Sequence, residues 1–180
     1  MFPDVVLQTQ RLTLRPLRPG DAEAVLAAAT DDETQRWLPL PRPYLREHAE
    51  GWCGEVSAAV RTSGQGIVRA VERDGRLAGC IDLKHVDWAA RTAEIGYWTV
   101  PDARGAGVIT EATRELARWA LADRGFERVE LRIAPGNTAS LRVAAKAGFV
   151  REGVARNAGF IHGGRVDLVI HSLVRADLAL

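Results

Sequence analysis

The sequence predicts an α/β (α+β) domain in which helices pack on the faces of a mixed β-sheet. Three observations support this fold class. Turn residues divide residues 66–100 into three strand-like segments, a helix–strand–helix order follows them, and the last part of the chain holds a further strand pair. Helices that accompany strands in this order bury their apolar faces against the sheet.

The N-terminal part predicts a short strand followed by a helix. The strand covers residues 11–15, and Pro16 ends it because proline lacks a backbone donor and has a fixed φ. Residues 21–30 are rich in alanine, and Asp21 and Glu23 place negative charge in the first turn, where it complements the helix dipole. A helix is therefore predicted over residues 21–30.

Alternating prolines separate this helix from the next one. Pro39, Pro41 and Pro43 exclude a regular helix, so residues 37–44 are predicted to form a loop. Helical character resumes over residues 45–61. The three strand-like segments then cover residues 66–72, 76–86 and 92–100, with Arg73-Asp74-Gly75 as the hairpin turn between the first two.

The C-terminal half predicts helices and strands in turn. Ile109, Ala112 and Leu116 recur at helical spacing, and Gly125 ends that helix. Apolar residues then alternate with charged ones over residues 129–133, which predicts a half-buried strand. The remaining predicted elements are a helix over residues 138–146, which Gly148 stops, and a strand pair over residues 149–156 and 165–174.

Composition limits the class of protein. With 180 residues, of which 47% are hydrophobic, the chain suits one domain over residues 1–180. A net charge of +1 favours neither nucleic acid nor an anionic membrane as partner. Cys53 and Cys80 are too few for a metal site of their own or a disulfide framework. The N-terminus does not resemble a signal peptide and no apolar run is long enough to span a membrane, so a cytoplasmic location is predicted.

A glycine-rich turn joins the third strand to the following helix, within Trp98–Ala112. Backbone N–H groups in such a turn, at a helix N-terminus, offer donors and a positive dipole end to an anion such as a pyrophosphate. Arg104 adds a full charge at the same place. The alternative interpretation is structural, since Gly105 and Gly107 also suit any tight turn that needs a positive φ.

A second motif, Asn-x-x-Ser followed by Lys-x-Gly-Phe within residues 137–153, gives the turn a context. The two motifs together resemble the GNAT N-acetyltransferase superfamily, and residues 9–22 resemble its RimJ/RimL branch, whose best-known members acetylate the N-termini of ribosomal proteins. The resemblance covers essentially the whole chain. It implies a GNAT-like mixed, mostly antiparallel central sheet of about six to seven strands with helices on both faces.

The resemblance also implies a coenzyme site for acetyl-CoA, as cosubstrate, and no metal. The glycine turn is expected to hold the coenzyme's pyrophosphate. Asn137 is expected to contact its pantetheine arm, although the commonest role of an asparagine there is to cap a helix. Ile109 replaces a residue that is usually small, and Asp102 stands where many members carry Gln or Arg. The expected coenzyme-binding residues are Trp98, Thr99, Val100, Arg104, Gly105, Ala106, Gly107, Val108, Ile109, Thr110, Asn137 and Arg142.

Ser140 is expected to act on the leaving thiolate. Many family members use a tyrosine nearer the Lys-x-Gly-Phe end of the helix, but Ala144 stands at that position here. The RimJ/RimL branch resembles this arrangement, with the serine near the thiol sulfur. The structural alternative is a hydroxyl that bonds back to a helix carbonyl.

Glu94 is the predicted general base. The period of a strand places Glu94, Gly96 and Trp98 on one face, where the small Gly96 leaves room for a ligand. A carboxylate there is expected to take a proton from an ammonium, through water. The alternative is a solvated strand residue. Asp167 and His171, on one face of the last strand, are the next candidates, and His85 and His162 are weaker ones.

Aromatic side chains suggest where the acceptor enters. Four residues, Trp37, Tyr44, Trp88 and Trp98, are predicted to frame an acceptor cleft, with residues 39–44 as a lid, and core packing is the alternative for each. The predicted reaction is direct acetyl transfer to a primary amine, specifically the α-amino group of a protein or peptide N-terminus. A small-molecule amine (antibiotic, polyamine or amino acid) and a catalytically silent acyl-CoA-binding module stay open as alternatives. A homodimer is a further possibility.

Overall fold

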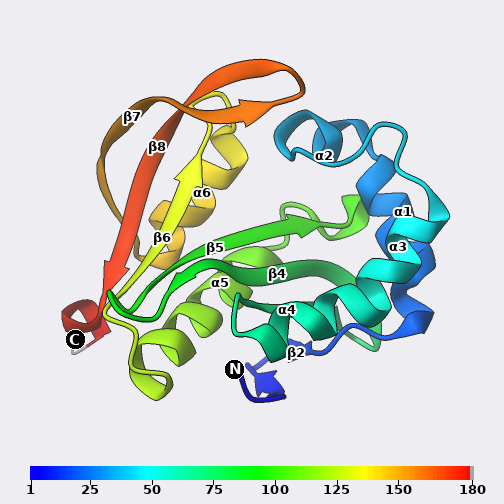
Figure 1. Ribbon diagram of the computed structural model, residues 1–180, viewed down its shortest axis with the longest axis horizontal. Coiled ribbons are helices and arrows are strands. Elements are labelled where there is room, and N and C mark those ends of the chain that lie inside the picture. Colours follow the sequence, from blue (N-terminus) through cyan, green and yellow to red (C-terminus); the bar gives the residue numbers. More distant parts are fainter. Residues whose placement is uncertain (179–180) are drawn as a thin grey trace.

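The fold is built on one sheet of eight strands in the order β1-β2-β3-β4-β5-β6-β8-β7, in a computed structural model that describes residues 1–178 (Figure 1). All neighbours pair antiparallel except β5 and β6, which are parallel. The predicted mixed, mostly antiparallel sheet is therefore confirmed. The strands are Leu7–Gln8 (β1), Thr13–Arg15 (β2), Ile67–Arg73 (β3), Arg76–Asp87 (β4), Thr92–Thr99 (β5), Arg128–Ile133 (β6), Val150–Ile161 (β7) and Gly164–Val174 (β8).

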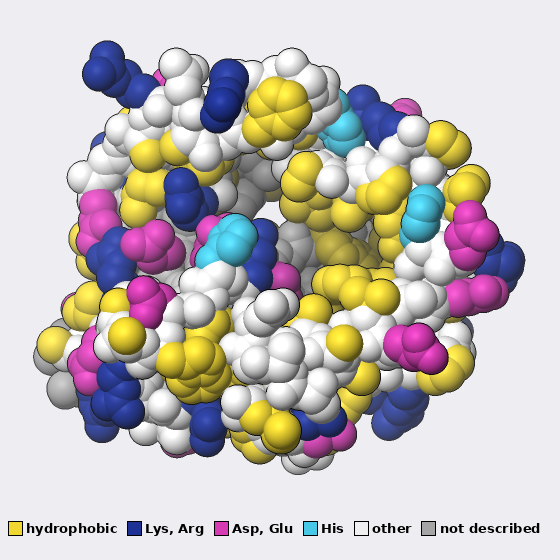
Figure 2. Space-filling model, in the orientation of Figure 1, with side chains coloured by type: hydrophobic (Ala, Val, Ile, Leu, Met, Phe, Trp, Pro, Cys, Tyr) yellow, Lys and Arg dark blue, Asp and Glu magenta, His cyan; other side chains and the backbone are white. Residues whose placement is uncertain are grey.

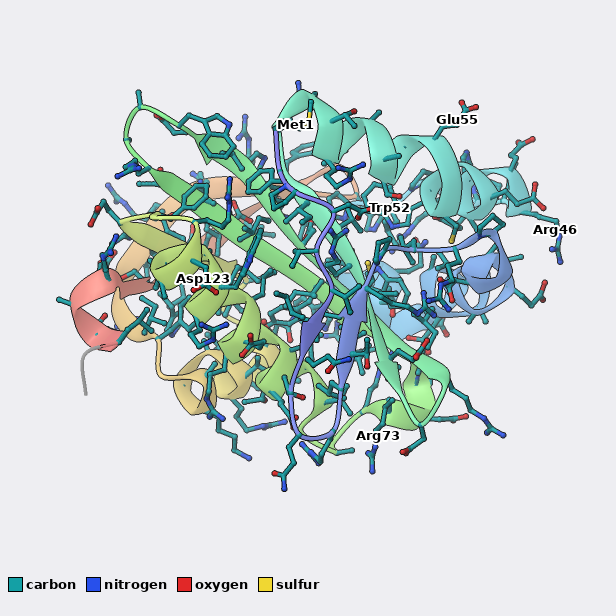
Figure 3. The ribbon with its side chains drawn as sticks, turned by 90° about the horizontal axis from the view of Figure 1, so that it is seen from below. Met1, Arg46, Trp52, Glu55, Arg73 and Asp123 are labelled. Carbon is teal, nitrogen blue, oxygen red and sulfur yellow. The ribbon has the colours of Figure 1, made fainter. Side chains whose placement is uncertain are left out.

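Helices cover both faces of the sheet, as predicted. Figure 3 shows the strands between a layer that holds α3 and α4 and a layer that holds α5 and α6. The α-helices are Ala22–Thr30 (α1), Asp32–Trp37 (α2), Arg46–Gly51 (α3), Ser57–Ser63 (α4), Val108–Arg118 (α5) and Thr138–Ala147 (α6). A π-helical turn, Trp52–Val56, joins α3 to α4, and another, Trp119–Asp123, extends α5; 3-10 turns cover Pro19–Asp21, Pro101–Ala103 and Arg175–Leu178.

Each face of the sheet has its own apolar core. The larger core lies beneath α5 and α6 and includes Leu83, Leu116 and Leu131. The smaller one lies beneath α1 and α3 and includes Cys53 and Cys80, both free and buried. Burial raises the pKa of Cys53 to about 11 and that of Cys80 well above its ordinary value, so both side chains stay neutral and serve packing.

The sheet separates between its two parallel strands. β5 and β6 pair only at Thr92↔Arg128, Ala93↔Val129 and Glu94↔Glu130. Beyond these pairs β5 follows β4 as far as Thr99, whereas β6 follows β8 as far as Ile133. Figure 1 shows the two strands starting together and diverging from there. One edge of β5 therefore has no strand partner beyond Glu94.

Two short elements differ from the sequence expectation. The sheet has eight strands rather than six to seven because β1 adds a strand of two residues, too short to show an alternating pattern. Helix α2 was not predicted; it has six residues, and its recognisable start is the Asp31 side chain, which accepts a hydrogen bond from the Thr34 N–H at 3.0 Å. The 73–75 hairpin turn was predicted, and positive φ values at Asp74 and Gly75 fit its type I′ geometry.

A buried ion network fixes the N-terminal segment against the sheet. Arg15 on β2 donates two hydrogen bonds to Asp21, at 2.8 and 2.9 Å, and a third to Glu72 on β3 at 2.5 Å. The Arg15 and Asp21 side chains are 6% and 10% exposed. Burial opposes ionisation of Asp21, but its bonds to Arg15 and to the Arg18 N–H hold its pKa below the ordinary value. The network thereby joins β2, β3 and the start of α1.

Asp21→Ala is expected to lower the free energy of unfolding by about 3 kcal/mol, because it leaves the buried Arg15 guanidinium without its main partner. Because the Asp21 pKa is lowered on folding, its stabilising contribution is present above its ordinary value of 3.8 and is lost as the pH falls through the lower folded value. Denaturant unfolding at several pH values measures both effects. Glu23→Ala, which breaks an exposed ion pair with Arg46, is the control; equal losses in the two variants would contradict the account.

Candidate active site

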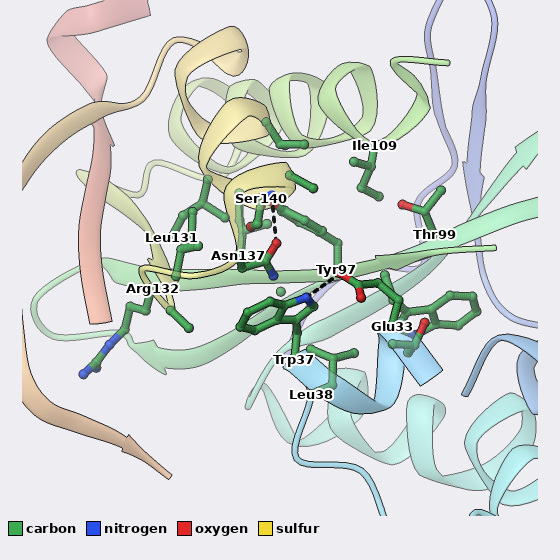
Figure 4. A pocket seen from close by; sticks show the side chains of 18 of the residues that line it. Glu33, Trp37, Leu38, Tyr97, Thr99, Ile109, Leu131, Arg132, Asn137 and Ser140 are labelled. Carbon is green, nitrogen blue, oxygen red and sulfur yellow. Dashed lines mark hydrogen bonds between the residues drawn. The ribbon is translucent and has the colours of Figure 1, made fainter. Parts of the chain in front are cut away.

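A cavity of about 230 Å³ occupies the gap between β5 and β6. Figure 2 shows a hollow in one face of the molecule, with hydrophobic side chains along one of its walls. In the close view, Asn137 and Ser140 at the start of α6 lie on one side, and Trp37 and Leu38 lie on the opposite side (Figure 4). Residues from β5, β6, the N-terminus of α5 and the β7–β8 hairpin complete the lining.

The glycine turn has the geometry of an anion cradle. Gly105 and Gly107 both have φ +75°, and Gly107 directly precedes α5. The Glu111 N–H bonds to the Gly107 carbonyl at 3.1 Å, so the N–H groups of the first three helical residues have no partner within the helix. Residues 104–107 are exposed. Unsatisfied donors at an accessible helix N-terminus suit a pyrophosphate.

The side chains beside this turn are committed to ion pairs. Arg104, expected to meet the phosphates, contacts the Asp31 carboxylate and donates to Thr34 Oγ1 at 3.1 Å. This contact with Arg104 is the main reason why the pKa of Asp31 is lowered. Arg11 pairs with Glu111 at 2.5 Å and points a guanidinium N–H at the Ala106 carbonyl at 3.4 Å. The sequence motifs did not reveal the Asp31 and Glu111 partners, because both contacts join segments far apart in the chain.

Two residues that differ from the family pattern, Ile109 and Asp102, lie in different surroundings. Ile109 is 8% exposed and belongs to the larger core, where it also lines the cavity, so its bulk points inward rather than over the turn. Val108 is buried beside it. Asp102 lies exposed in the 3-10 turn Pro101–Ala103. The side chains of Ile109 and Val108 therefore leave the exposed face of the turn open.

The start of α6 brings two predicted residues together. Asn137 caps the helix, since its Oδ1 accepts a hydrogen bond from the Ser140 N–H at 3.0 Å, and both residues line the cavity. Ser140 Oγ lies 2.7 Å from Tyr97 Oη on β5. Ala144 is fully buried, and Arg142 is exposed and outside the cavity lining.

Tyr97 was missed because the sequence analysis assumed a strand with one face toward the ligand. Residues 94–99 all line the cavity, so both faces of β5 contribute to it. Side chains alternate between the two faces of a strand in any case, but at an edge without a neighbouring strand both faces border the same gap. Where β6 departs, Tyr97 reaches the cavity from one face, and Glu94 and Trp98 reach it from the other.

Acidic and basic side chains meet at the narrow end of the gap. Glu94, with a side chain 12% exposed, lies 3.3 Å from Lys84 Nζ and 2.9 Å from His85 Nδ1. Asp82, which the sequence analysis missed, pairs in register with Gly96, and burial raises its pKa. A Cβ at Gly96 would lie 2.5 Å from Asp82 Oδ1 and 3.0 Å from Lys84 Nζ. Gly96 thus leaves room for these two side chains, in contrast to the ligand space expected there.

The secondary base candidates lie outside the cavity lining. Asp167 accepts a hydrogen bond from the Asn157 N–H at 2.8 Å, at an irregular part of β7. His171 is buried, which lowers its pKa. His162 on the β7–β8 hairpin lies 2.6 Å from the Gln35 carbonyl on α2. His85 is exposed and contacts Glu94.

The aromatic residues predicted to frame the cleft separate into two that line the cavity, Trp37 and Trp98, and two that do not. Trp37 lines it, donates to Glu33 at 2.7 Å and lies close enough to Gly136 that a Cβ there would be 3.0 Å from its ring. Tyr44 instead packs on the smaller core. Trp88 packs against Phe2, with ring centroids 5.0 Å apart, and donates to the Gly64 carbonyl at 2.9 Å. Neither Tyr44 nor Trp88 belongs to the cavity lining, because both rings serve packing.

Within residues 1–178, no cluster of three or more His, Cys, Asp or Glu side chains is arranged to hold a metal ion. Over the same residues, no helix combines the length and apolar character needed to cross a membrane.

Comparisons with known proteins connect this geometry to one family. The family model described as "Acetyltransferase (GNAT) domain" matches residues 11–150. The chain is 33% identical over 176 residues to a Bacillus subtilis (strain 168) protein named "Putative ribosomal N-acetyltransferase YdaF", a match that covers 93% of each chain.

Solved structures agree with that match. One described as "Probable acetyltransferase" is 31% identical, with a TM-score of 0.83 over 96% of this chain and 98% of its own. The structure described as "Mycobacterium smegmatis RimJ in complex with CoA-disulfide" has a TM-score of 0.90 over 100% of this chain and 93% of its own. At 24% identity, the second likeness concerns the fold.

Gly107→Trp is expected to abolish acetyl-CoA binding in calorimetry while the protein stays soluble, because a large side chain at the start of α5 blocks the free N–H groups. Gly75→Trp is a matched control: Gly75 has φ +74° and open space around it in the β3–β4 turn, so the substitution adds the same backbone strain away from the cavity. Unchanged affinity in Gly107→Trp would exclude the turn as the pyrophosphate site.

Proposed function

The chain belongs to the GNAT acetyltransferase family, and we propose that it transfers an acetyl group from acetyl-CoA to the α-amino group of a protein or peptide N-terminus. The observation that carries this proposal is the cavity between β5 and β6, which is lined both by Ile109 at the start of α5 and by Glu94. The relative named as a putative ribosomal N-acetyltransferase supports a protein acceptor. A single acetyltransferase domain over residues 1–180, a cytoplasmic location and a homodimer stay predictions.

The donor side of the cavity fits acetyl-CoA. The N–H groups that open α5 suit the pyrophosphate, and the positive φ of Gly105 and Gly107 keeps side chains away from it. Beyond Glu94 the free edge of β5 offers backbone N–H and C=O groups to the pantetheine amides and to the thioester oxygen. Asn137 and Ser140 face the same space from α6. The coenzyme supplies an activated acetyl group as a thioester.

The acceptor side provides negative charge for an incoming ammonium. Glu94, which lines the cavity, attracts the cation and removes its proton, directly or through one water. The neutral nitrogen then bonds to the thioester carbon, the C–S bond breaks and its electron pair leaves on sulfur. Ser140 stabilises that thiolate. The nitrogen loses a second proton when the tetrahedral intermediate collapses. Of the two protons released, one protonates the coenzyme thiolate and the other passes to solvent. Because the gap holds both reactants next to each other, it lowers the entropic part of the activation barrier.

Incubation of the protein and acetyl-CoA with intact ribosomal proteins, N-terminal peptides and small amines is expected to acetylate α-amino groups, as read by mass spectrometry. Gly107→Trp protein is the background control. Labelling of small amines alone would contradict the acceptor class and favour metabolite or drug modification. Coenzyme binding without any labelled amine would identify a silent acyl-CoA-binding module.

Glu94→Gln is expected to lower kcat at least about 100-fold with little change in acetyl-CoA affinity, because the amide keeps the shape of the side chain but cannot take a proton. Steady-state kinetics on the best acceptor measures this. Glu55→Gln, an exposed position on the π-helical turn before α4, is the matched control. A kcat within a few-fold of the unmodified protein would remove Glu94 from the base role.

A further inference from the structure

Tyr97 and Ser140 form a hydroxyl pair in the wall of the cavity. Tyr97 Oη lies 2.7 Å from Ser140 Oγ, although one residue is on β5 and the other on α6, 43 positions apart. Both residues line the cavity and both are partly buried. Figure 4 shows them on the same side of the cavity, away from Trp37. The contact therefore joins β5 to α6, beyond the point where β5 and β6 stop pairing.

The direction of this hydrogen bond follows from the chemistry of the two hydroxyl groups. Burial raises the pKa of Tyr97 to about 12, so the phenol keeps its proton at neutral pH. Among the described residues, Ser140 Oγ is the acceptor within hydrogen-bonding distance of that phenol. In either direction one hydroxyl hydrogen of the pair is left for the cavity, but a phenol is the more acidic hydroxyl and therefore the stronger donor. Donation from Tyr97 to Ser140 is thus the favoured direction.

This arrangement frees the Ser140 hydrogen. A serine in the first turns of a helix commonly donates back to a carbonyl of the preceding turn. Here the backbone of Ser140 is held by the Asn137 cap, and its oxygen is held by Tyr97. The hydroxyl hydrogen can then point into the cavity. Ala144, one turn further along α6, is buried and carries no hydroxyl that would take over this task.

We propose that Tyr97 is a positioning residue for the leaving group: its hydroxyl donates to Ser140 Oγ, and the oriented Ser140 hydroxyl donates to the coenzyme sulfur as the C–S bond breaks. The inference rests on the proposed function in that it needs coenzyme A in this cavity. Tyr97 moves no proton in this account. It sets the direction of the hydrogen bond from the Ser140 hydroxyl to the coenzyme sulfur, and this bond becomes stronger as negative charge develops on the sulfur.

A titration of bound coenzyme A tests the inference without any acceptor amine. The thiolate absorbance of coenzyme A is followed against pH in complexes with the unmodified protein, Tyr97→Phe and Ser140→Ala. We expect a thiol pKa below that of free coenzyme A in the unmodified complex, and a rise toward the free value in both variants. An identical thiol pKa in the unmodified and Tyr97→Phe complexes would overturn the inference. Thermal melting shows that each variant is folded.

Steady-state kinetics gives an independent reading. Tyr97→Phe is expected to lower kcat about tenfold, as for one hydrogen bond lost in the transition state, with the KM for acetyl-CoA nearly unchanged. The double variant with Ser140→Ala is expected to be no slower than Ser140→Ala alone, since both act through one bond. Multiplied losses, or a Tyr97→Phe kcat equal to that of the unmodified protein, would overturn the inference.

The two experiments separate this inference from the proposed function. If no amine is acetylated but Tyr97→Phe still raises the thiol pKa, the proposed reaction fails and the hydroxyl pair is supported. If amines are acetylated and Tyr97→Phe changes neither thiol pKa nor kcat, the reaction stands and the positioning role is wrong. Ser63→Ala, an exposed serine on α4, is the control for loss of a helix hydroxyl.

Discussion

The early end of the β5–β6 ladder is the constraint on which the rest of the site depends. Three residue pairs hold the parallel strands together, and each strand then follows a different neighbour. Because the strands are parallel, both of their carboxyl ends face the same gap, and each is followed by a helix N-terminus, that of α5 or that of α6. Ligands of α/β proteins bind at such places, where strand connections diverge. The gap thus exposes a backbone edge, two helix dipoles and both faces of β5.

Three arginine side chains join the elements that surround this opening. Arg15 fixes β2 and the start of α1 to β3, Arg11 connects the N-terminal segment to α5, and Arg104 joins the glycine turn to the Asp31 cap of α2. Because Asp31 and Glu111 already balance the two arginines nearest the turn, attraction of an anion there depends chiefly on the backbone N–H groups. Through its contacts with Asp31 and Thr34, Arg104 also joins α2, which carries Trp37, to the glycine turn.

The sequence predicted local features well and long-range ones poorly. The strand-to-turn-to-helix segment, the Asn137 cap and the glycine turn follow from residues adjacent in the chain, and the structure has each of them. Tyr97, Asp82 and helix α2 were missed, and Trp88 lies outside the cavity lining. These positions depend on where β6 separates from β5 and on which aromatic rings pack in the core. The spacing of residues within one segment of the sequence indicates neither.

A crystal structure of the protein with coenzyme A would test the central claim most directly. The account predicts pyrophosphate oxygens that accept hydrogen bonds from the N–H groups at the start of α5, pantetheine along the free edge of β5, and sulfur beside Ser140. Coenzyme bound elsewhere, or pyrophosphate held by side chains remote from the glycine turn, would contradict it.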